Sequence, residues 1–264
     1  MSDNESDFGS NLFEEPEDFC PPPPASHFVD YERKNHTQGP SKILLKLVGK
    51  SPLWGHLLWN AGKYTADYLD KHSDRLVQGK KVLELGAAAG LPSLVCGING
   101  ASKVLCTDYP DPDLLSHIQY NVDHCDGIPE STDVKVTGFI WGQDETALCY
   151  DGLKENELPQ QIAEDAKFDL IILSDLVFNH TEHRKLLSNC RNALKKNGTA
   201  LVVFSPHRPW LLNDDLQFFT TCEDFQFKAD FIELVNWKPM FEEDDETVEI
   251  RSRVYCYELR PQWD

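Results

Sequence analysis

The 264-residue sequence lacks the patterns typical of membrane and secreted proteins. No window approaches eighteen uninterrupted apolar residues, the length that a membrane-spanning helix needs. The first residues are acidic rather than basic and then apolar, which argues against a secretory signal. The eight cysteines are scattered without a Cys-x-x-Cys pair, a usage that suits a reducing compartment. We therefore expect a cytoplasmic protein with no membrane partner.

Basic residues are also scarce, at 25 Lys and Arg against 44 Asp and Glu, which gives a formal net charge of −19. No basic stripe is left to contact phosphates, so direct nucleic-acid binding is excluded. A basic protein partner would complement this charge, but acidic surfaces also simply keep proteins soluble. The composition leaves both explanations open.

The sequence contains no His-Glu-x-x-His, no Gly-x-Ser-x-Gly and no phosphate-binding loop ending in Gly-Lys-Thr. These absences argue against a zinc protease, a serine hydrolase and a P-loop enzyme. His180 and His183 have a three-residue spacing, but no third metal ligand is placed near them. We expect surface histidines at a helix N-terminus, and no metal site.

The most informative stretch is a strand-to-helix turn around Gly86 and Gly90. Small residues after a buried strand let the backbone approach a ligand closely. The spacing Glu-x-Gly-x-x-x-Gly lacks the Gly-x-Gly-x-x-Gly that a dinucleotide pyrophosphate needs. Asp108 follows about twenty positions later at the end of another strand, where an acid suits a ribose diol. The pattern predicts S-adenosylmethionine, with an ordinary tight turn as the alternative.

Short apolar strands alternate with helical segments, which predicts an α/β fold with a parallel sheet. We expect strands at Lys81–Leu85, Lys103–Asp108, Val134–Ile140, Phe168–Ser174 and Thr199–Phe204, and helices from Trp59 to about Lys71 and at Leu91–Asn99, Asp113–His124 and His180–Lys195. A strand or hairpin arm is expected at 43–48, and a short helix at 158–166. Two last runs, Phe227–Trp237 and Val254–Leu259, predict an edge hairpin with one antiparallel strand.

Residues 1–26 are acidic, contain no Lys or Arg, and end near four consecutive prolines. Such a segment buries too little apolar area to offset its ordering entropy. We expect a flexible tail at 1–26 and one domain at 27–264.

Four motifs of this chain resemble the family-16 seven-β-strand protein methyltransferases. They are Leu83-Glu84-Leu85-Gly86 through Leu91, Asp108-Tyr109, Phe139-Ile140-Trp141-Gly142 and Ser174-Asp175-Leu176-Val177-Phe178. The resemblance covers about residues 50–260. It implies a Rossmann-like sheet of seven strands, mostly parallel with an antiparallel C-terminal edge hairpin and helices on both faces.

The same resemblance implies which residues hold S-adenosylmethionine. Most of them follow the first two strands or are aromatic: Trp59, Glu84, Gly86, Ala87, Ala88, Asp108, Tyr109, Trp141 and Ser174. Ile140 stands where the family usually has an acid, so an acid contact to adenine is not available there. An aromatic face near the sulfonium is a cation–π arrangement worth roughly 0.5–2 kcal/mol.

The expected catalytic residues are Asp175 and Phe178, after a central strand. Open α/β sheets bind ligands at this edge. Asp175 could hold an acceptor ammonium and Phe178 could line the methyl path, unless Asp175 only caps the following turn. Residues 205–210 either shape the acceptor groove or only end a strand. No histidine is an obvious base at this edge.

Within the family, the leading residues 15–20 and 28–31 most resemble a fungal branch, the nicotinamide N-methyltransferase-like proteins. This branch implies methylation of translation elongation factor 1-alpha at its N-terminal α-amine and an adjacent lysine. The alternatives are a small-molecule amine methyltransferase of the nicotinamide type, a lysine-only protein methyltransferase, and a binding module without activity. We expect a monomer.

Overall fold

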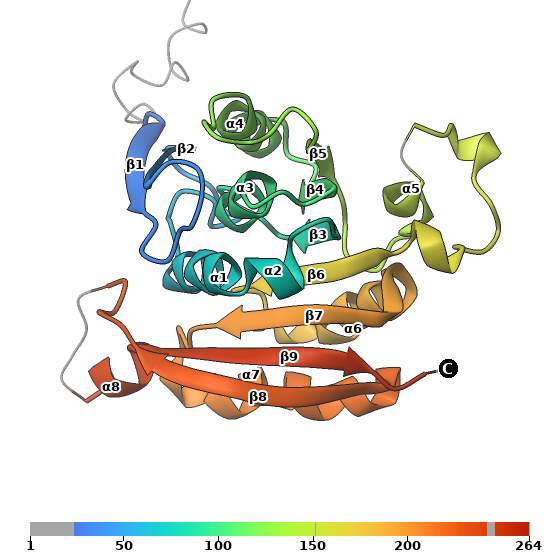
Figure 1. Cartoon of the computed structure of the whole chain (residues 1–264). Coiled ribbons are helices and arrows are strands. Elements are labelled where there is room, and N and C mark those ends of the chain that lie inside the picture. Colours follow the sequence, from blue (N-terminus) through green and yellow to red (C-terminus); the bar gives the residue numbers. More distant parts are fainter. Residues whose placement is uncertain (1–23, 151, 242–245, 264) are drawn as a thin grey trace, which may run out of the picture.

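A computed structural model describes residues 24–150, 152–241 and 246–263 (Figure 1). Its centre is a seven-stranded sheet with the order β5-β4-β3-β6-β7-β9-β8. The strands are β3 (Lys81–Leu85), β4 (Lys103–Asp108), β5 (Asp133–Gly138), β6 (Phe168–Ser174), β7 (Leu194–Phe204), β8 (Phe227–Asn236) and β9 (Arg253–Pro261). The first five pair in parallel, whereas β9 runs antiparallel to both β7 and β8. The expected sheet with its antiparallel C-terminal hairpin is confirmed.

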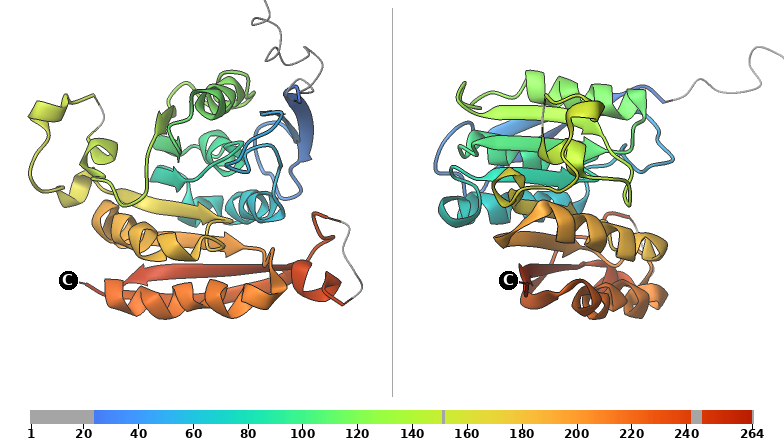
Figure 2. Two further views of the ribbon diagram at one scale, coloured as in Figure 1. Left: turned by 180° about the vertical axis from the view of Figure 1, so that it is seen from behind. Right: turned by 90° about the vertical axis from the view of Figure 1, so that its right-hand side faces the viewer.

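Helices cover both faces of the sheet, as expected (Figure 2). One face carries α1 (Asn60–Lys71), α3 (Leu91–Ile98) and α4 (Pro112–Asp123), and the other carries α6 (His183–Ala193) and α7 (Leu212–Thr221). Successive strand residues alternate between two cores: Val82 packs with α1 and α3, whereas Leu83 packs with α6 and α7. This period of two is what a sheet buried on both faces requires.

Several element boundaries differ from the sequence prediction. Helix α7 was not expected, and β7 begins at Leu194, inside the expected helix His180–Lys195, because Leu194 pairs with Phe168 in the sheet. The shorter elements are α2 (Ser73–Leu76), α5 (Thr146–Cys149), α8 (Val248–Arg251) and the 3-10 turns Glu155–Glu157, Glu164–Ala166, His180–Glu182, Pro209–Leu211 and Cys222–Phe225.

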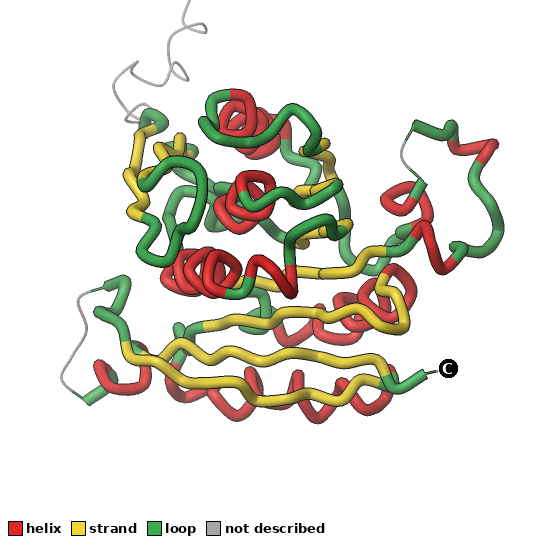
Figure 3. Tube along the Cα trace, viewed as in Figure 1, coloured by secondary structure: helices red, strands yellow, loops and turns green. Residues whose placement is uncertain are grey.

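The expected helix at 158–166 is wrong, since only the 3-10 turn Glu164–Ala166 forms there. The segment between α5 and β6 buries almost none of its side chains, so little packing favours a helix. It extends beyond one end of the sheet (Figure 3). The Lys81 ammonium, at the start of β3, donates to the carbonyl oxygens of Cys149 and Ala166. This connection therefore lies at the amino-terminal edge of the strands.

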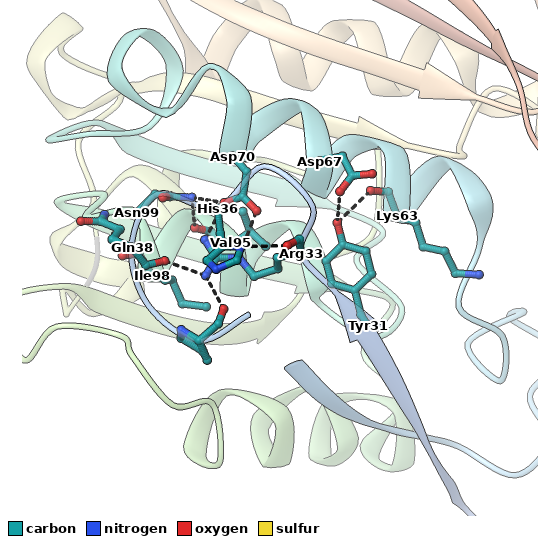
Figure 4. A network of polar contacts seen from close by, with 11 residues as sticks. Tyr31, Arg33, His36, Gln38, Lys63, Asp67, Asp70, Val95, Ile98 and Asn99 are labelled. Carbon is teal, nitrogen blue, oxygen red and sulfur yellow. Dashed lines mark hydrogen bonds and ion pairs between the residues drawn. The ribbon is translucent and has the colours of Figure 1, made fainter. Parts of the chain in front are cut away.

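A separate hairpin, β1 (His27–Glu32) and β2 (Lys42–Leu47), packs beside α1 and α3 and confirms the strand expected at 43–48. Arg33, only 2% exposed, donates to both carboxylate oxygens of Asp70 on α1, at 3.0 and 2.6 Å (Figure 4). Asn99 donates to the same carboxylate at 2.7 Å. These buried bonds tie the hairpin to the domain.

The predicted tail, residues 1–26, falls largely on 1–23, which lie outside the described residues. Its flexibility stays a prediction. Among the helices that the structure describes, none is long and apolar enough to cross a membrane.

Candidate active site

A cleft of about 710 Å³ opens at the carboxyl ends of the parallel strands. Its walls follow β3, β4, β5, β6 and β7, and the segment before α1 completes them. Every site residue predicted from sequence lines this cleft: Trp59, Glu84, Gly86, Ala87, Ala88, Asp108, Tyr109, Trp141, Ser174, Asp175 and Phe178. The volume lies within the range of about 300–1,000 Å³ that small-molecule sites occupy.

The turn after β3 needs glycine at its first position. Gly86 has a φ of 64°, and a Cβ atom there would lie 2.6 Å from Leu176 Cδ2 and 3.0 Å from the ring of Trp141. A side chain would therefore be strained and would fill the floor of the cleft. Glycine at position 86 therefore lets the backbone of this turn approach a ligand closely.

Asp108 at the end of β4 is fixed by this turn. Its carboxylate accepts hydrogen bonds from the backbone N–H groups of Ala88 and Tyr109, both at 2.7 Å. Burial raises the pKa of Asp108, and these two bonds offset only part of that effect. An ionised carboxylate has about four acceptor positions, so two remain for a ribose diol.

Glu84 lies deeper than the other predicted residues, with 1% of its surface exposed. It accepts hydrogen bonds from the Ser93 backbone N–H at 2.9 Å and the Ser93 hydroxyl at 2.5 Å. Burial raises the pKa of Glu84 to about 8, although both bonds act in the opposite direction. The side chain thus ties the end of β3 to the first turn of α3, and its contact with a cofactor stays a prediction.

Aromatic side chains form the walls. Trp59 precedes α1 and its indole N–H donates to the carbonyl oxygen of Trp54 at 3.1 Å, while Trp141 follows β5 and Tyr109 follows β4. Tyr109 is 49% exposed and free to contact a bound ring. The glycine floor, the Asp108 carboxylate and these aromatic faces fit an adenosyl sulfonium.

Asp175 adopts a left-handed backbone conformation, with a φ of 61°, directly after β6. Its Oδ1 accepts a hydrogen bond from the Ser205 backbone N–H at 3.2 Å, and its Oδ2 lies 2.9 Å from His207 Nε2. Both partners follow β7, so the alternative of a local cap for the next turn is wrong. Such strain in a non-glycine residue is typical of functional sites.

His207 belongs to the segment 205–210 that the sequence places at this edge, but the sequence did not identify it as a base, and its contact with Asp175 was not predicted. Its ring lies 4.9 Å from the ring of Trp59 and 6.5 Å from that of Phe178, measured between centroids. His207 and Arg208 both line the cleft. This lining agrees with the groove-shaping alternative for 205–210, and contact with an acceptor stays a prediction. The sequence offered one indication of the contact between His207 and Asp175. Strands β6 and β7 are parallel neighbours, so the residues that follow them lie at the same edge of the sheet.

The two histidines considered for metal binding are held by other partners. His183 is buried rather than on the surface, and its Nε2 lies 2.6 Å from the Val177 carbonyl oxygen. His180 Nε2 lies 2.7 Å from Asp215 Oδ1. Within the described residues no group of three or more His, Cys, Asp or Glu side chains could hold a metal ion. Among the further lining residues without a predicted role are Pro52, Leu53, Trp54, Leu57, Leu58, Asn179, Glu182 and Phe241.

Comparison with known proteins gives consistent matches. A family described as lysine methyltransferase matches residues 48–225. Proteins named protein N-terminal and lysine N-methyltransferase EFM7 are similar over nearly the whole chain: 65% identity in Debaryomyces hansenii (100% of both chains), 58% in Candida albicans (100% of both) and 42% in Schizosaccharomyces pombe (98% of both).

Solved structures show the same fold at low identity. A structure classed as a methyltransferase and complexed with SAH matches with a TM-score of 0.55 and 14% identity, over 82% of this chain and 53% of that one. The YcgJ protein from Bacillus subtilis matches with a TM-score of 0.53 and 13% identity, over 76% of this chain and 99% of that one.

Proposed function

Because this chain belongs to the lysine methyltransferase family and is an S-adenosylmethionine-dependent protein N-methyltransferase, we propose that it methylates translation elongation factor 1-alpha. The proposed acceptors are the N-terminal α-amine of that factor and an adjacent lysine. We further propose that it acts as a monomer in the cytoplasm.

The observation that carries the proposal is the charge of the cleft. Asp108, Asp175 and Glu182 are acidic, whereas Arg208 is the Lys or Arg side chain among the described lining residues. An acidic cleft attracts ammonium groups, and the net charge of −19 extends this attraction to a basic protein. Charge of this sign favours an amine on a basic protein over a nucleic acid.

We assign one set of cleft residues to the cofactor and another to the acceptor amine. In this proposal Gly86, Asp108 and Trp141, which line the cleft, hold the cofactor, and the cofactor supplies an activated methyl group on sulfur when bound. Asp175 and Phe178 lie where an acceptor amine would enter. Alignment of the amine with the methyl group is the main task of such a site, since no covalent nucleophile is needed.

The chemistry favours the α-amine as the first acceptor. Its reference pKa is about 7.7–8.0 and that of lysine about 10.4, so at pH 7 roughly one α-amine in ten is neutral against about one lysine in 2,500. Modification of the N-terminus first and the lysine after it follows from this difference.

The test is mass spectrometry of the N-terminal peptide of the factor after reaction at several pH values. We expect methyl groups on both acceptors, with a rate that rises with pH more steeply for the lysine. Matched substrates are the factor with its N-terminus acetylated and the factor with the lysine changed to arginine. Methyl groups found only on internal lysines, or only on small amines such as nicotinamide, would exclude the proposal.

A further inference from the structure

His207 lies in the cleft beside Asp175, and both its ring and its backbone are held by contacts with other parts of the chain. The imidazole Nε2 lies 2.9 Å from Asp175 Oδ2, and the ring packs against Trp59. The His207 carbonyl oxygen accepts a hydrogen bond from Arg251 Nη1 at 2.6 Å. Backbone and ring are therefore both fixed, while the side chain still lines the cleft.

The Asp175 carboxylate is already engaged by the protein on both oxygens, by the Ser205 N–H and by His207. It is therefore better placed to orient the imidazole than to take a proton from the acceptor. With Nε2 donating its hydrogen to Asp175, the lone pair of Nδ1 is the one that can accept a proton. No described residue forms a hydrogen bond with that nitrogen.

We propose that His207, oriented by Asp175, removes the proton from the acceptor ammonium inside the cleft, so that the amine reaches the methyl group as a neutral nucleophile. This inference rests on the proposed function, because it requires an amine acceptor. The ammonium gives one proton to His207. The amine lone pair then forms the N–C bond as the S–C bond breaks, and the electron pair of that bond stays on sulfur.

The charges around His207 support this role. Asp175 faces it from the end of β6, Asp215 from α7 and Arg251 from α8, and Arg208 is its neighbour in the chain. Burial lowers the pKa of His207, but the charge and hydrogen bond of Asp175 outweigh this effect and raise the pKa above the ordinary value. A general base works best when its pKa lies near the operating pH.

The benefit of such a base differs between the two acceptors. Without it, only the fraction of amine that is already neutral can react, about one in ten for an α-amine and one in 2,500 for lysine at pH 7. With it, the abundant ammonium form can bind the acidic cleft and lose its proton there. His207 should therefore matter more for lysine than for the α-amine.

The experiment compares wild type, His207→Gln and the control His180→Gln, whose histidine also pairs with a carboxylate but does not line the cleft. Two peptides from the N-terminus of the factor separate the acceptors: one has a free α-amine and arginine in place of lysine, and the other has an acetylated N-terminus and the lysine. For His207→Gln at pH 7 we expect kcat/KM to fall about tenfold on the first peptide and at least about 100-fold on the second.

At pH 9 the α-amine is mostly neutral, so His207→Gln should recover to within about threefold of wild type on the first peptide. His180→Gln should stay within about twofold of wild type throughout. Cofactor affinity, measured by calorimetry, should be unchanged in both variants. A loss of equal size on both peptides at both pH values would show a merely structural role and overturn the inference, and so would no loss.

A second measurement does not depend on turnover. The pKa of the His207 ring, followed by NMR in the full chain, should fall in Asp175→Asn because the carboxylate charge is lost. An unchanged pKa would overturn the inference. If wild type methylates neither peptide, the proposed function fails, and this titration still decides whether Asp175 controls the proton affinity of His207.

Discussion

The substitution Asp70→Asn is expected to be strongly destabilising although it changes one atom of the side chain. Asp70 accepts two hydrogen bonds from Arg33 and one from Asn99, and the Arg33 and Asp70 side chains are both fully buried. The variant keeps the shape of the site but leaves the guanidinium charge without its counter-charge.

The magnitude follows from that burial. Removing one partner of a buried ion pair costs about 3–5 kcal/mol, because the remaining charge stays out of water without compensation. Each kcal/mol lowers the melting temperature of a domain of about 150–250 residues by roughly 2–4 °C. We therefore expect a melting temperature about 6–20 °C below that of wild type.

The assay is thermal and urea unfolding, both followed by circular dichroism, with Glu32→Gln as the matched control. Glu32 also pairs with a cation on this hairpin, Lys42 at 3.0 Å, but both side chains are more than half exposed. The control should change the free energy of unfolding by no more than about 0.5 kcal/mol. In a double-mutant cycle, Arg33→Met should couple to Asp70→Asn by at least about 1 kcal/mol. If Asp70→Asn were no more destabilising than the control, the reasoning would be refuted.

Three further predictions concern the cofactor site and the tail. Asp108→Asn should weaken S-adenosylmethionine binding at least tenfold, because hydrogen bonds to a charged acceptor contribute about 1.5–3 kcal/mol each. Calorimetry measures this affinity. Equal binding by a folded variant would show that Asp108 only fixes the turn. Glu84 keeps a proton in the folded state between about pH 4.5 and 8 that the unfolded chain has lost, so its contribution to stability falls as pH rises through that window. Glu84→Gln should therefore change less in unfolding free energy between pH 5.5 and 8 than wild type, and identical slopes would contradict the burial argument. Removal of residues 1–26 should preserve cooperative melting and cofactor binding, whereas a lost melting transition would refute the tail prediction.

Sequence reasoning succeeded where residue type and chain position specify structure locally. The glycine turn at Gly86 and the acid at Asp108 lie at a fixed offset within one β3-α3-β4 unit, so their pattern predicted both fold and ligand. It failed where partners come from separate strands. The contact between Asp175 and His207 depends on the pairing of β6 with β7, and His207 carries no motif of its own. The helix expected at 158–166 is wrong for a different reason. The local pattern there resembles a helix, but the segment has no surface of the domain to pack against.

The position of β9 has a consequence for the order in which the chain can fold. In the sheet, β8 pairs with β9 alone, and β9 is also what joins β8 to β7. During synthesis β8 therefore leaves the ribosome before the strand that will hold it, and until β9 follows, its backbone N–H and C=O groups have no partner in the sheet. Phe231 and Leu234 on β8 remain exposed even after folding, at 54% and 37%. This makes the interval between β8 and β9 the stage of biogenesis at which strand-to-strand aggregation is most favourable.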